Sequence, residues 1–79
     1  MDLHSEVTRN LNAASKKWIE KDNLHGYALI EQAYKFRDDE TCRLYTLYGC
    51  TNYTYILETV DTVVRNFIQQ LGYFDVVIV

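Results

Sequence analysis

The sequence predicts an α+β domain, a two-layer sandwich in the order α-β-β-α-β with both helices on one face of a three-stranded sheet. Residues 2–22 and 53–71 repeat apolar side chains with the period of an amphipathic helix, about 3.6 residues. Residues 27–50 are rich in Tyr, Leu and Thr and are interrupted by charges, and residues 74–79 are almost wholly apolar. Residues 1–79 are expected to form one domain, because a smaller unit would bury too little apolar surface.

The first helix is expected over residues 2–22. Asp2 and Ser5 are candidate N-caps, and lysines gather in the last turns, where the helix dipole favours cations. Residues 23–26 supply the break, because Asn and Gly adopt the left-handed conformation that ends helices. The apolar stripe has spacings of three and four residues and consists of Leu3, Val7, Leu11, Ala14 and Trp18.

A β-hairpin is expected over residues 27–50, with its loop at residues 38–40. This register places most of the large apolar groups on one face, and slipping it by one residue would mix the two faces. The alternative is a helix over residues 24–36, because Ala, Leu, Glu and Gln favour helices and several aromatic and aliphatic side chains there have helical spacing.

The second helix is expected over residues 53–71. It has a broad apolar face, a supportive pair in Asp61 and Arg65, and Gly72 as its C-cap. Residues 74–79 then read as a strand that is buried on both faces. This helix would connect the second strand to the third strand, which runs parallel to it, by a right-handed crossover. Both helices can then lie on the same face of the sheet.

The composition restricts the classes of partner. The chain has 11 acidic and 8 basic residues, and its net charge of −3 weakly repels nucleic acid and anionic lipid. No apolar run approaches the roughly 18 residues that a spanning helix needs. We therefore expect a cytoplasmic protein without a membrane partner. Its small size and acidity suggest an adaptor, or a bacterial or viral inhibitor of a larger protein.

We expect no catalytic residue, no metal site and no cofactor, and therefore no enzyme. His4 and His25 fall at expected end or loop positions and are expected to be exposed. The acidic residues 38–40 lack the further oxygen ligands of a calcium loop and are expected to be a solvated hairpin tip. Cys42 and Cys50 are expected to be buried, inert thiols. A disulfide between them is not expected, because along an extended strand they would lie roughly 26 Å apart.

The expected sheet has a second face that no helix covers. Exposed Tyr and Leu side chains rimmed by charge are typical of protein interfaces, where Tyr and Arg are enriched. Ordinary strand alternation is the alternative interpretation of the same residues. The candidate protein-binding residues are Tyr27, Leu29, Arg43, Tyr45 and Leu47.

The function expected from these observations is that of a small non-enzymatic protein–protein interaction module. It would inhibit or modulate a larger protein, or would associate with a second copy as a homodimer. One alternative is a sheet surface that stacks single-stranded nucleic acid on its tyrosines, although few basic groups are available for it. The other alternative is a purely structural subunit of an oligomer.

Overall fold

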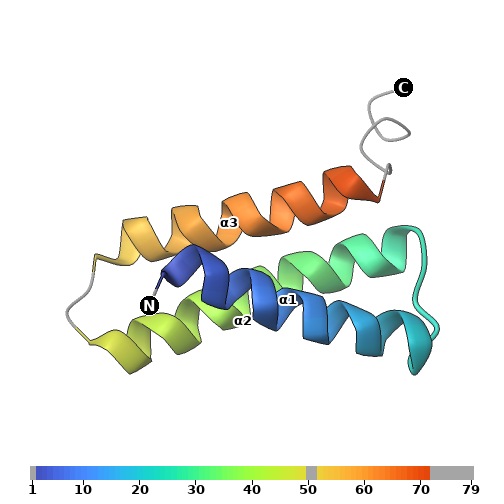
Figure 1. The fold of residues 1–79 in the computed structure, drawn as a ribbon, viewed down its shortest axis with the longest axis horizontal. Coiled ribbons are helices and arrows are strands. Elements are labelled where there is room, and N and C mark those ends of the chain that lie inside the picture. The colour runs from blue at the N-terminus through green and yellow to red at the C-terminus, as the bar shows by residue number, and fades with distance from the viewer. Residues whose placement is uncertain (1, 50–51, 72–79) are drawn as a thin grey trace.

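The computed structural model describes residues 2–49 and 52–71, and over these residues the chain forms three helices and no strand. The helices are α1 (Leu3–Glu20), α2 (Tyr27–Tyr48) and α3 (Tyr53–Gln70). Each packs against the other two. Figure 1 shows α1 and α3 running in the same general direction and α2 running back in the opposite direction, so the arrangement is an up-down-up bundle.

The predicted α+β sandwich is therefore wrong, and the error lies in residues 27–48. The β-hairpin expected there is a single helix, α2. The helical alternative over residues 24–36 gave the right element type, but α2 continues beyond it to Tyr48. The acidic residues at 38–40, which suggested a turn, lie within this helix. Glu40 accepts a hydrogen bond from Asn10 in α1, and the preceding Arg37 donates one to Asp61 in α3.

The two amphipathic helices are confirmed. Of the two candidate N-caps of the first helix, Asp2 caps α1 and Ser5 lies inside it, and Asn52 caps α3. The backbone N–H of His4 donates to Asp2 Oδ1 at 3.3 Å, and the N–H of Tyr55 donates to Asn52 Oδ1 at 3.2 Å. The break after α1 contains two residues with positive φ, Asn23 at 56° and Gly26 at 60°. Both values lie in the region that Gly, and to a lesser degree Asn, adopts at low cost.

The core lies along the axis where the three helices meet. Trp18 is buried and packs edge-on against Phe36, with ring centroids 6.1 Å apart, whereas Phe67 is only partly buried. Burial of this apolar set provides the main driving force for folding. The buried hydrophobic residues are Val7, Leu11, Trp18, Leu29, Ile30, Ala33, Leu44, Ile56, Val60, Val63, Val64 and Ile68.

Two expectations about burial also change with the fold. Leu29, expected on the open face of a sheet, is only 2% exposed and belongs to the core. Cys42, expected to be buried, is an exposed free thiol, because in a helix position 42 lies on the side opposite the buried Leu44. Cys50 lies outside the described residues.

The expected C-terminal strand over residues 74–79 and the expected cap Gly72 also lie outside the described residues. None of the helices in the described part of the chain combines the length and the apolar character needed to cross a membrane.

Candidate functional site

Exposed aromatic side chains gather where α2 ends and α3 begins. Seven large hydrophobic side chains are exposed among the described residues, and five of them lie at this end of the bundle. The other two, Ile19 and Tyr27, lie at the opposite end, on either side of the α1–α2 connection (Figure 1). The five residues, here called the tyrosine end, are Tyr45, Leu47, Tyr48, Tyr53 and Tyr55, with exposed fractions of 44, 60, 46, 46 and 55%.

Two rings of the tyrosine end pack against each other across the α2–α3 connection. Tyr45 and Tyr53 form an edge-to-face pair with centroids 5.2 Å apart and planes at 85°. Such pairs stabilise a protein by about 0.5 to 1.5 kcal/mol beyond the area they bury. The contact holds both rings in place while leaving nearly half of each residue open to solvent.

A buried carboxylate lies beside the tyrosine end. Glu40 is 6% exposed, and its oxygens accept from Asn10 Nδ2 at 2.8 Å, from Arg43 Nε at 2.8 Å and from Arg43 Nη2 at 3.0 Å. Burial opposes the ionisation of Glu40, but the hydrogen bonds from Arg43 and Asn10 outweigh it and hold the pKa of Glu40 below its ordinary value. The ionised carboxylate thus ties α1 to α2.

The same hydrogen-bond network reaches one of the exposed tyrosines. Arg43 Nη2 lies 3.4 Å from Glu6 Oε2, and the hydroxyl of Tyr48 donates to Glu6 Oε1 at 3.0 Å. The bond to Glu6 raises the pKa of Tyr48, and the bond to Glu40 raises the pKa of Arg43. Tyr48 is therefore held by α1 as a protonated donor, with half of its surface exposed.

A second group of charges lies at the middle of the bundle and is neutral as a whole. Arg37 contacts Asp61 and Asp38, each at 3.2 Å, and its guanidinium lies 5.2 Å from the centroid of the Tyr34 ring. The pair expected from the sequence is confirmed, because Arg65 Nε lies 2.7 Å from Asp61 Oδ2. These contacts join α2 to α3.

The remaining charges are distributed unevenly between the two ends. Residues 2–10, 38–48 and 53–61 form the half that contains the tyrosine end (Figure 1). Apart from the neutral group above, this half has five carboxylates and two arginines, for a net charge of −3. Counted in the same way, residues 11–36 and 62–70 carry four lysines and three carboxylates, for a net charge of +1. The unbalanced negative charge thus surrounds the tyrosine end.

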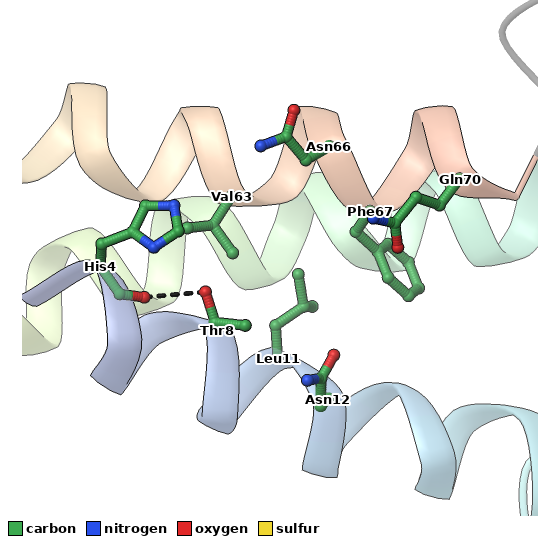
Figure 2. A pocket seen from close by; sticks show the side chains of 8 residues that line it. All are labelled: His4, Thr8, Leu11, Asn12, Val63, Asn66, Phe67 and Gln70. Atoms are coloured by element: carbon green, nitrogen blue, oxygen red, sulfur yellow. Dashed lines mark hydrogen bonds between the residues drawn. The ribbon is translucent and has the colours of Figure 1, made fainter.

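A shallow groove lies between α1 and α3. Figure 2 shows amide side chains of Asn12, Asn66 and Gln70 along it, with apolar side chains between the helices. Its volume of about 160 Å³ is smaller than the roughly 300 Å³ at which ligand pockets begin. The groove therefore ranks below the tyrosine end as a candidate. Its lining residues are His4, Thr8, Leu11, Asn12, Val63, Asn66, Phe67 and Gln70.

The helical fold separates the predicted binding residues. Arg43, Tyr45 and Leu47 share the C-terminal end of α2 and lie at or beside the tyrosine end. Tyr27 lies at the far end of the same helix, and Leu29 is in the core. The sequence interpretation missed Tyr48, Tyr53, Tyr55 and the buried Glu40. Glu40 and Arg43 are three residues apart, a spacing at which side chains meet on the surface of a helix. This spacing was a signal in the sequence that Glu40 pairs with Arg43 within a helix.

The two histidines lie apart, one in α1 and one in the connection between α1 and α2. His4 and His25 are exposed, and His25 Nδ1 lies 3.3 Å from the carbonyl oxygen of Asn23. Within residues 2–49 and 52–71, no three His, Cys, Asp or Glu side chains are grouped so that they could hold a metal ion. Comparisons with family models, curated proteins and solved structures found no significant match to this chain.

Proposed function

We propose that this protein is a non-enzymatic interaction module that binds a larger protein through the tyrosine end. The observation that carries the proposal is the gathering of four exposed tyrosines and Leu47 at one end of a small bundle. Tyrosine is enriched at protein interfaces and among the residues that contribute most of the binding energy. The opposite end exposes only Ile19 and Tyr27 among its large hydrophobic residues in the described chain.

The arrangement of the rings supports the same proposal. Tyr45 and Tyr53 hold each other, and Tyr48 is held by Glu6, so these rings are already ordered before a partner arrives. Ordering a free side chain on binding costs about 0.5 to 1.5 kcal/mol, and preorganised rings avoid much of that cost. An inhibitor or modulator that binds by rigid docking would have this kind of surface.

The cellular setting forms part of the proposal. Cys42 is an exposed thiol, and such thiols stay reduced in the cytoplasm, where we place the protein. The nucleic-acid alternative required an open sheet, and the described residues contain none. It is therefore not retained.

The proposal is tested by selecting random displayed peptides on the wild-type protein. Selected peptides are then measured on Leu47→Ser/Tyr55→Ala and on the control Ile19→Ser/Tyr27→Ala, which likewise removes one exposed aliphatic residue and one exposed tyrosine, but from the opposite end. We expect the peptides to lose binding to the first variant and to keep it with the second, while both variants melt near the wild-type temperature because the replaced side chains are exposed. Peptides that bind both variants equally would contradict the proposal.

A further inference from the structure

We propose that the segment recognised by the tyrosine end is basic, with Arg or Lys side chains placed against its rings and carboxylates. This inference rests on the proposed function and assigns the chemistry of the partner. The observation behind it is that exposed tyrosines and an excess of negative charge lie at the same end of the bundle.

The basic groups near the tyrosine end do not cancel this charge. Arg43 lies between Glu40 and Glu6, so two carboxylates face one guanidinium. Arg9 is the other arginine of this half, whereas Asp2, Asp39 and Glu58 are all exposed carboxylates. The field around the rings therefore attracts cations, and like-charged partners are disfavoured.

The tyrosines provide a second attraction for the same groups. A guanidinium or ammonium over a tyrosine ring is attracted by the negative face of the ring, and Arg stacks on it particularly well. Tyr55 and Glu58 are three residues apart in α3 and so lie on the same side of the helix. One Arg side chain of a partner can therefore contact a ring and a carboxylate together. A neutral partner would use only the rings.

A second copy of the chain fits this surface less well. Two tyrosine ends brought face to face would place the negative halves of both molecules together, which opposes association at low salt. The opposite end of another copy carries a net charge of only +1 in the described residues. Charge complementarity thus favours a basic protein segment over self-association.

The first test uses the composition of the peptides selected above. We expect those that depend on Leu47 and Tyr55 to be enriched in Arg and Lys relative to the starting library. Peptides that depend on these residues but are neutral or acidic would overturn the basic partner and leave the interaction function standing. If no selected peptide depends on these residues, both proposals fail.

The second test measures charge directly with a fluorescent peptide that alternates Arg with Gly and Ser, titrated by anisotropy against a peptide with Gln for Arg. We expect Glu58→Lys to weaken binding of the Arg peptide roughly tenfold, and the matched control Glu31→Lys, in the first turns of α2 far from the tyrosine end, to weaken it less than about twofold. Glu58→Gln removes the charge without reversing it, and a smaller loss in the same direction is expected.

Salt separates charge recognition from apolar contact. Raising the salt from about 0.1 M to about 1 M shortens the screening length from roughly 10 Å to 3 Å, so the affinity for the Arg peptide should fall steeply. Equal effects of Glu58→Lys and Glu31→Lys, or equal binding of the Arg and Gln peptides, would overturn the inference. So would a dimer in sedimentation that Leu47→Ser/Tyr55→Ala abolishes, because the surface would then belong to a second copy.

Discussion

At position 40 a carboxylate is buried, although the adjoining acidic residues Asp38 and Asp39 are exposed. Three acidic residues in a row suggested a solvated turn. Their surroundings differ because a helix rotates successive residues by about 100°, so Glu40 faces α1 while its neighbours face water. The contact that reveals this difference is the hydrogen bond from Asn10 in α1, and Asn10 is 30 residues away in the sequence.

Replacing Glu40 with Gln should lower the free energy of unfolding by about 1 to 3 kcal/mol at neutral pH, because it removes charge-assisted hydrogen bonds to Arg43 and Asn10. Since the folded protein holds the pKa of Glu40 below its ordinary value of 4.5, the wild-type advantage should be present above that value and be lost as the pH falls through the folded-state pKa. Urea unfolding across this range measures both effects.

Asp39→Asn is the matched control for this prediction, since it removes an exposed carboxylate one residue away. It should change stability by less than about 0.5 kcal/mol. A pH-independent difference between wild type and Glu40→Gln would show that the Glu40 charge does not contribute.

At the scale of elements, the sequence identified α1 and α3 and misjudged α2. Both α1 and α3 have one apolar face with polar residues opposite, which is the pattern of a helix at the surface of a bundle. The middle helix packs on both sides, against α1 through Glu40 and against α3 through Arg37, so polar groups interrupt its apolar face. With aromatic and β-branched residues added, this pattern resembles alternating strands. Local periodicity carries no information about such pairing between helices.

The error in α2 also explains which of the binding residues could be predicted from the sequence. Arg43, Tyr45 and Leu47 lie near one another in any local structure, because they are close in the sequence. Tyr27 and Leu29 were joined to them only by the register of a hairpin that does not form. Tyr53 lies beside Tyr45 because α3 turns back after α2, which depends on the correct fold.

Proline at position 39 distinguishes the helix from a hairpin. In the interior of α2, Asp39→Pro removes a backbone hydrogen bond and clashes with the preceding turn, so it should destabilise the protein by about 3 kcal/mol or more. Asp39→Ala at the same exposed position should be neutral or slightly stabilising, because Ala favours helices. Far-UV circular dichroism during thermal melting measures both, and an unaffected proline variant would mean that position 39 is in a loop.

For the whole molecule, the uneven distribution of charge bears on self-association. The half around the tyrosine end carries a net charge of −3, and the other half carries +1. A homodimer was among the expectations from the sequence, and the described surface opposes one that pairs the two tyrosine ends. The stability of a domain this small then depends on its own core.

We therefore expect a monomer at low salt whose sedimentation coefficient does not change with concentration. High salt screens the repulsion between the negative halves, so weak association through the exposed rings is expected only there. Sedimentation velocity at several concentrations in low and high salt measures this directly. A stable dimer at low salt would contradict the charge argument.

The position of Trp18 has a practical consequence for studying this protein. It is the only tryptophan in the chain, it is buried against Phe36, and it lies near the C-terminal end of α1. The exposed tyrosines of the tyrosine end lie toward the other end of the bundle (Figure 1). Tryptophan emission therefore reports the integrity of the core, while tyrosine absorbance includes the four rings of the tyrosine end. Folding and binding can thus be followed optically in one unlabelled sample.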